Sequence, residues 1–212
     1  DRFPASHEPI SLSLGNASIY DHEDLYWRME TEHLRRQFGE RVKPRLTSDI
    51  VHLSVFSLAP IPLLIELGRL LSDIPAAEIF QLHREPPSWK WLKDQNPFEF
   101  SVAQDGTGAE SVVAINLSLS ANVANERIRS VLGDECCVYT VAPPAPGNDF
   151  LKSKSQLQLF RQTMRGLFDQ IKLAHGEACS LSMFPAVPVA AAVEIGRIWM
   201  PKADLPFHVY DQ

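Results

Sequence analysis

The sequence is poor in cysteine, and it contains neither a long apolar run nor a glycine-rich phosphate loop. Three cysteines in 212 residues are too few for a disulfide framework. We expect Cys136, Cys137 and Cys179 to be small buried side chains of a cytoplasmic protein. No apolar run approaches the roughly 18 residues that a membrane helix needs. The pattern G-x-G-x-x-G is missing, which gives NAD binding little support.

The sequence also lacks an excess of basic over acidic residues, and it lacks the common catalytic motifs. The formal net charge is −6, whereas a domain that holds duplex DNA by its phosphates is usually basic, so we expect no direct nucleic-acid binding. A small anionic ligand needs only local positive charge. There is no H-E-x-x-H, G-x-S-x-G or P-loop motif, and the seven histidines are scattered. We therefore expect no catalytic residues, no metal and no cofactor in this chain.

A stretch of 17 residues occurs twice, 128 positions apart. Residues 53–69 read L-S-V-F-S-L-A-P-I-P-L-L-I-E-L-G-R, and residues 181–197 read L-S-M-F-P-A-V-P-V-A-A-A-V-E-I-G-R. Seven positions are identical, where average composition gives about one match by chance. We interpret this as an internal duplication of one strand–turn–helix unit.

Periodicity predicts further strands and helices around each copy. In the first half they are a strand at 10–14, a helix from 21 to about 42 that Pro44 ends, a strand at 50–57, a helix that starts near Ile61 or Pro62 and runs to about Leu71, and a strand at 78–83. In the second half they are a strand at 98–104 in a hairpin with 111–118, helices at 123–132, 149–175 and 189–199, and strands at 136–142, 178–184 and 207–210. Residues 10–14 also resemble 115–119 at a different shift, which leaves the phase of the first strands open.

Strands that alternate with helices predict an α/β fold with mostly parallel sheets. The repeat divides it into two halves, about 10–105 and about 110–212, which we expect to be related by a pseudo-twofold axis. Residues 1–9 are polar and contain two prolines, as an interdomain linker would. We expect another domain to precede this linker in a longer protein.

In such folds ligands bind beyond the carboxyl ends of the strands, where helix N-termini offer free N–H donors that suit phosphate. The repeat places a proline turn there in each half. The first turn comprises Ser57, Leu58, Ala59 and Pro60, and the second follows Phe184 and contains Pro185 and Pro188. Two such turns facing each other would fit a ligand with two or more phosphates and a near-twofold shape. The repeat alone leaves a purely structural role equally open.

The stretch P-P-S-W-K-W at residues 86–91 combines aromatic and basic side chains. Trp89 and Trp91 flank Lys90, shortly after Arg84 at a strand end. Indole and guanidinium planes stack on bases, and lysine pairs with phosphate. Further candidates are a stacking face, Tyr139, and two charges at the first turns of the long second-half helix, Lys152 and Lys154. The alternative that both tryptophans belong to the core stays open.

Both copies of the repeat end in Glu-x-Gly-Arg, at 66–69 and 194–197. Glu and Arg three positions apart on a helix form a surface pair worth a few tenths of a kcal/mol. A glycine inside a helix costs about 1 kcal/mol against alanine. Its presence in both copies predicts a close approach of backbones between the halves, and we prefer this interpretation to catalysis.

The combination of F-S-L-A-P-I-P-L-L-I-E-L-G-R-L-L, I-F-Q-L-H-R, W-K-W and a second copy ending in H-V-Y resembles the SAVED domain of CBASS anti-phage effectors. The resemblance extends from about Ile10 to Gln212. It implies two fused CARF-like, Rossmann-related halves, in agreement with the repeat. It is strongest to effectors in which an HNH endonuclease precedes the SAVED domain.

This resemblance implies a sensor of cyclic oligonucleotides made by a partner nucleotidyltransferase. For the HNH type the expected ligand is a cyclic dinucleotide such as 3′,2′-cyclic GMP-AMP, and binding is expected to drive homo-oligomerisation that activates a fused DNA endonuclease. Other members use cyclic tri- or tetra-adenylate with TIR or protease effectors. Two further hypotheses remain: a ring nuclease that degrades its own ligand, and a purely structural oligomerisation domain.

Overall fold

The computed structural model describes residues 9–15, 19–48, 52–72, 76–93 and 98–211. Residues 1–8 of the predicted linker lie outside this part. The chain divides into two compact units, Asp1–Leu53 and Ser54–Gln212. Within the described residues no helix is both long enough and apolar enough to cross a membrane. The boundaries expected for the two CARF-like halves stay a prediction.

The first unit is one long helical stretch. It consists of α1 (Asp24–Gln37), a π-helical turn η1 (Phe38–Val42) and α2 (Lys43–Ser48). The prediction that Pro44 ends this helix is wrong. In the widened turn before the proline, the Lys43 N–H donates to the carbonyl of Phe38, five residues back. Such a turn relieves the clash that a proline ring makes with the carbonyl four residues before it.

The predicted strand at 10–14 is also wrong, because side chains of the first helical stretch take over its backbone groups. Gln37 Nε2 donates to the Ser13 carbonyl at 2.7 Å, and Gln37 Oε1 accepts from the Ser13 N–H at 3.2 Å. Arg41 donates to the Ser11 carbonyl at 2.9 Å. Alternating residues favour a strand only where a neighbouring strand offers ladder partners, and here side chains compete for the same groups.

Both copies of the repeat form the predicted strand–turn–helix unit, each followed by a further strand. The first copy comprises β1 (Leu53–Phe56), α3 (Ile61–Leu71) and β2 (Ala77–Phe80), and β1 neighbours β2 in a two-stranded sheet. The second comprises β8 (Ser180–Ala186), α6 (Val189–Ile198) and β9 (Phe207–Val209). Pro60 and Pro188 are the residues immediately before their helices. Of the strand predicted at 50–57, residues 50 and 51 lie outside the described part.

The second unit contains a five-stranded sheet in the order β5-β7-β6-β8-β9. The three strands not yet defined are β5 (Ser101–Asp105), β6 (Val112–Ser118) and β7 (Cys136–Ala142). The pairs β6–β7, β6–β8 and β8–β9 are parallel. The mostly parallel α/β sheet predicted from the sequence is therefore confirmed.

The predicted hairpin of residues 98–104 with 111–118 is wrong. β5 pairs antiparallel with β7, and β6 lies on the other side of β7. Gly106, at φ 147°, permits the crossing, since a Cβ there would lie 2.9 Å from the Cα of Cys137. The chain can pass this close to β7 only where a residue has no side chain.

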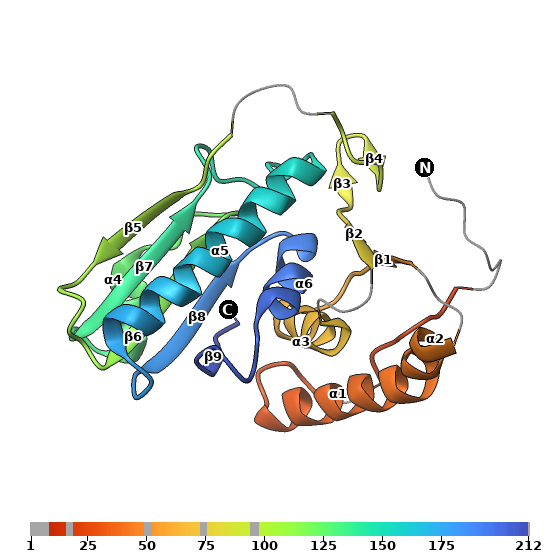
Figure 1. Ribbon diagram of the computed structural model, residues 1–212, viewed down its shortest axis with the longest axis horizontal. Helices are drawn as coiled ribbons and strands as arrows, with labels where there is room; N and C mark the ends of the chain where they lie inside the picture. Colours follow the sequence, from red (N-terminus) through yellow and green to blue (C-terminus); the bar gives the residue numbers. More distant parts are fainter. Residues whose placement is uncertain (1–8, 16–18, 49–51, 73–75, 94–97, 212) are drawn as a thin grey trace. The chain divides into compact units, whose positions relative to one another are not determined.

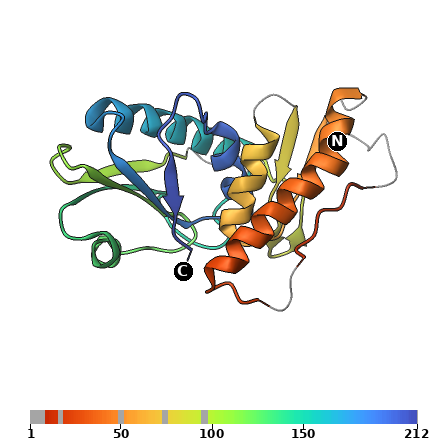
Figure 2. The ribbon, with the colours of Figure 1, turned by 90° about the horizontal axis from the view of Figure 1, so that it is seen from below.

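Helices cover both faces of this sheet (Figures 1 and 2). α5 (Lys154–His175) lies over one face and α4 (Asn125–Leu132) over the other. On the α4 side a buried cluster includes Ile128, Val138 and Phe184. Two short strands, β3 (His83–Arg84) and β4 (Pro87–Ser88), form a separate antiparallel hairpin after β2.

The helices α3 and α6 pack against each other at the two repeated glycines. A Cβ on Gly68 would lie 1.9 Å from the carbonyl oxygen of Val193, and a Cβ on Gly196 would lie 1.9 Å from that of Ile65. Real Cβ atoms do not come this close to an oxygen. The close approach of backbones expected from the repeated Glu-x-Gly-Arg is therefore confirmed.

Candidate functional site

The first proline turn is open to solvent. Leu58 is 66 % exposed, and Ala59 and Pro60 are half-buried. Ser57 is buried, and its Oγ has no hydrogen-bond partner among the described residues. The first turn of α3 follows directly, with the N–H groups of Leu63 and Leu64 both bonded to the Pro60 carbonyl. The unused hydroxyl is therefore shielded from solvent, and the N–H groups of Leu63 and Leu64 in the adjoining helix start are already bonded.

The second proline turn is largely occupied by the protein itself. Pro188 is buried and Pro185 is half-buried. The N–H of Ala190, in the first turn of α6, donates to Gln81 Oε1 at 3.2 Å. Gln81 follows β2, so the start of the second-half helix lies beside the end of a first-half strand. The structure thus brings parts of both halves together, and the second turn is the less exposed of the two.

Two predicted residues, Tyr139 and Phe184, lie in the core. The Tyr139 side chain is fully buried, and its hydroxyl lies 3.0 Å from Nε2 of His175 in α5. Burial is the main cause that raises the pKa of Tyr139 to about 12. Phe184 stacks on Tyr210 with ring centroids 4.7 Å apart. Neither ring has a free face for a ligand, so we leave both out of the proposed site.

Trp89 and Trp91 face different surroundings. Trp89 lies edge-on to Phe56 at 5.3 Å, and Phe56 stacks on Phe80 at 4.5 Å. Trp91 lies edge-on to His83 at 5.8 Å. The sequence alone did not indicate Phe56 or Phe80 as site residues. The repeat did align Phe56 with Phe184, and this placed Phe56 near the end of a predicted strand.

A polar cluster surrounds Trp91. His83 is buried, its Nδ1 lies 3.7 Å from Oδ1 of Asp149, and neither of its ring nitrogens makes a hydrogen bond with the described residues. The Trp91 Nε1 is likewise buried without a hydrogen bond to them. The N–H of Leu92 donates to the Lys152 carbonyl at 2.8 Å, which fixes this segment beside the loop before α5. No motif around Asp149 in the sequence indicates that it lies beside His83 and Lys152.

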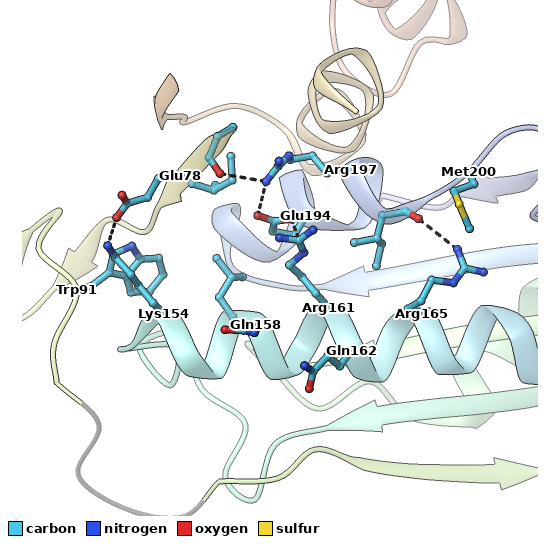
Figure 3. A pocket seen from close by; sticks show the side chains of 14 residues that line it. Glu78, Trp91, Lys154, Gln158, Arg161, Gln162, Arg165, Glu194, Arg197 and Met200 are labelled. Atoms are coloured by element: carbon cyan, nitrogen blue, oxygen red, sulfur yellow. Dashed lines mark hydrogen bonds and ion pairs between the residues drawn. The ribbon is translucent and has the colours of Figure 1, made fainter. Parts of the chain in front are cut away.

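A cleft of about 820 Å³ lies between β2, α5 and α6 (Figure 3). Trp91 and Lys154 are the two predicted site residues among those that line it. Lys154 pairs with Glu78 across the cleft, and Arg161 pairs with Glu194 at 3.2 Å. Lys154 and Arg161 therefore each already have a carboxylate partner in the same chain, and Glu194 is shared with Arg197.

Exposed positive charge without an ion pair to the described residues lies on the β3–β4 hairpin, at Arg84, and two residues after it, at Lys90; these two are called the hairpin cations. Arg84 and Lys90 are exposed, and neither pairs with a carboxylate of the described residues. Lys152 Nζ, by contrast, lies 3.7 Å from Oδ2 of Asp149. Of the four predicted cations, the two hairpin cations are the ones left for a phosphate. No group of three or more His, Cys, Asp or Glu side chains in the described part could hold a metal ion.

The fold and the site together define an α/β domain built on a duplicated strand–turn–helix unit. Residues 34–212 match the model of the SAVED family, the SMODS-associated and fused to various effectors sensor domain. The chain belongs to this family. No curated protein is detectably similar in sequence.

Solved structures of the Acinetobacter baumannii Cap4 SAVED/CARF-domain containing receptor are similar in fold. The receptor alone has a TM-score of 0.56 at 12 % identity, covering 87 % of this chain and 39 % of its own. Its form with the cyclic trinucleotide 2′3′3′-cAAA scores 0.57 at 15 % identity, covering 87 % and 41 %. Its form with 3′3′3′-cAAA scores 0.54 at 16 % identity, covering 86 % and 41 %. This chain thus spans about two fifths of the length of the Cap4 receptor.

Proposed function

We propose that this chain is a sensor domain for a cyclic oligonucleotide, bound around the Ser57–Pro60 turn and the β3–β4 hairpin. The observation that carries the proposal is that three features of nucleotide recognition occur together in a SAVED fold. They are the exposed ring of Phe56 beside the half-buried Trp89, the exposed cations Arg84 and Lys90, which pair with no carboxylate of the described residues, and the start of α3. Stacking, ion pairing and N–H donation are the contacts that such a ligand needs.

The leading ligand is a cyclic dinucleotide such as 3′,2′-cyclic GMP-AMP, as expected for HNH-type members of the family. A cyclic trinucleotide is the second candidate, because the Cap4 receptor has been solved with 2′3′3′-cAAA and with 3′3′3′-cAAA. Calorimetric titration with these three compounds and with cyclic tetra-adenylate separates the candidates. Binding by none of them contradicts the proposal.

Ligand binding is proposed to drive homo-oligomerisation and so to activate a fused effector. The family description, a sensor domain fused to various effectors, supports this arrangement. A DNA endonuclease is the leading effector, with TIR and protease effectors as alternatives, and a cytoplasmic nucleotidyltransferase would supply the ligand. Light scattering with and without ligand tests the oligomerisation step, and a molar mass that ignores ligand contradicts it.

The domain is proposed to bind its ligand without cleaving it. A ring nuclease needs a general base or an activated nucleophile at the scissile phosphate. His83, the histidine nearest the proposed site along the chain, is buried beside Asp149 and Trp91. Chromatography after a long incubation is expected to return the ligand intact, whereas linear products would show ring nuclease activity.

A further inference from the structure

The two copies of the repeat carry the same aromatic residue but expose it differently. Phe56 in β1 is 55 % exposed, whereas the corresponding Phe184 in β8 is 2 % exposed. Each ring stacks on another near the end of the neighbouring strand, Phe56 on Phe80 and Phe184 on Tyr210. The repeated phenylalanine is therefore part of a stacked pair in both halves, but it lies in the core in one half and at the surface in the other.

The helix α4 accounts for this difference in the second half. Its residues Ile128 and Leu132 pack in the cluster that contains Phe184 and Tyr210. In the first half Trp89 approaches the stack edge-on, at an interplanar angle of 89° to Phe56, and leaves more than half of the Phe56 surface accessible. Phe56, Phe80 and Trp89 are named here the aromatic platform.

The surroundings of the aromatic platform decide what fits on it. Leu58, two residues after the end of β1, adds exposed apolar surface, but the next features are polar: the start of α3 and the hairpin cations. A helix that covered the platform with an apolar face, as α4 covers Phe184, would leave Arg84 and Lys90 at its rim without partners, which costs desolvation. A nucleotide matches both parts, because it joins a planar apolar ring to a phosphate.

We propose that the aromatic platform binds a base of the cyclic oligonucleotide, with the adjoining phosphate at the hairpin cations and the start of α3. This inference rests on the proposed function and specifies its base-binding subsite. Every base has a π-face, and a base stacked on an aromatic side chain typically gains about 1–3 kcal/mol. A purine offers the larger face of overlap, so the platform favours a purine-containing ligand.

Leucine substitutions test the platform by removing the ring while keeping an apolar side chain. Calorimetry with 3′,2′-cyclic GMP-AMP, 2′3′3′-cAAA and 3′3′3′-cAAA is expected to show that Phe56→Leu and Trp89→Leu each raise the Kd about 10-fold for the compound that wild type binds. Phe56→Tyr and Trp89→Phe, which keep a ring, should stay within about 3-fold of wild type. The matched control is Tyr20→Leu, which removes an exposed ring in the first unit.

Fluorescence gives a second measurement that does not depend on the leucine variants folding. A base that stacks on Phe56 lies beside the edge-on Trp89 and should quench its emission, so the ligand-induced quench should vanish in Trp89→Phe and persist in Trp199→Phe. Unchanged affinity in folded leucine variants, or a quench that survives in Trp89→Phe, overturns the platform and leaves the sensor function standing. Leucine variants that change the molar mass of the ligand-free protein at unchanged affinity would instead identify a protein interface and overturn base binding. Failure of wild type to bind any of the three compounds overturns both proposals.

Discussion

At the scale of single residues, the four predicted cations differ in whether they have a carboxylate partner. Lys152 and Lys154 are held by Asp149 and Glu78, whereas Arg84 and Lys90 pair with no carboxylate in the described part of the chain. The sequence could not distinguish these pairs, because their partners are distant along the chain or lack any motif. It did place all four near strand ends or helix starts, where an anion would bind.

The double variant Arg84→Ala/Lys90→Ala is expected to weaken ligand binding about 5- to 30-fold at low salt. The reason is the loss of two phosphate-directed charges, whose effect shrinks as salt screens them. Titrations at two salt concentrations measure both the loss and its decline. Lys202→Ala, at an exposed lysine in the turn after α6, serves as the control. An affinity that is independent of Arg84 and Lys90 at low salt would remove the hairpin from the site.

Tyr139 is expected to make the protein less stable in strong base. Its folded pKa is raised to about 12, chiefly by burial, while the unfolded value is about 10. Between these pH values the unfolded chain has released a proton that the folded protein still holds, so stability falls as pH rises from about 10 to 12. Denaturant unfolding across this range should show a shallower fall in Tyr139→Phe. Identical pH profiles for the two proteins would contradict the assignment.

The sequence also could not tell which strand faces are covered. Strands such as β7 and β8 are apolar on both faces, so alternation gives no inward and outward side. For this reason Tyr139 and Phe184 were candidates for the ligand edge, and the structure places both in the core. Phe56 shows the converse case, since the identical residue of the first copy lies at the surface.

At the scale of elements, the repeated helix pair is the best-determined part of the fold. A proline before each helix and a glycine inside it predicted the starts of α3 and α6 and their close packing, because both signals are local and steric. Non-local choices were not predictable in the same way. The partner of β5 and the fate of residues 10–14 depend on which distant groups compete for the same backbone hydrogen bonds.

Gly68→Ala is expected to destabilise the protein by about 1–3 kcal/mol or more, because its Cβ would overlap the Val193 carbonyl of α6. Gly166→Ala is the matched control, since a Cβ in the middle of α5 meets nothing within 4 Å. It should stabilise the protein by up to about 1 kcal/mol. Urea unfolding of the two variants measures the contrast. Equal effects of the two substitutions would contradict close packing of α3 on α6.

The repeated Glu-x-Gly-Arg pairs are expected to differ in energy. Glu194 is buried between Arg197, at 2.9 Å, and Arg161, and Arg197 also donates to the carbonyls of Ser72 and Ala77. Glu194→Ala should cost about 3–5 kcal/mol, because it leaves a buried guanidinium uncompensated. Glu66→Ala should cost only about 1 kcal/mol, because its partner Arg69 is partly exposed. Thermal unfolding of both variants checks this order, and a larger loss for Glu66→Ala would refute it.

At the scale of the whole molecule, the duplication is present but unequal. The second half has a five-stranded sheet covered on both faces, whereas the first copy contributes a two-stranded sheet with an exposed aromatic stack. Because of this asymmetry, the two proline turns are not equivalent, although the repeat alone would suggest that they are. The turn at Ser57–Pro60 is partly exposed, whereas Pro188 is buried and the helix start after it is bonded to Gln81.

The most direct test of the central claim is calorimetric titration of this chain with cyclic oligonucleotides and with their linear counterparts. A sensor of the proposed kind should bind at least one of 3′,2′-cyclic GMP-AMP, 2′3′3′-cAAA, 3′3′3′-cAAA and cyclic tetra-adenylate with a micromolar or lower Kd, and it should discriminate against the opened ring. Heats no different from buffer for every cyclic compound would contradict the account.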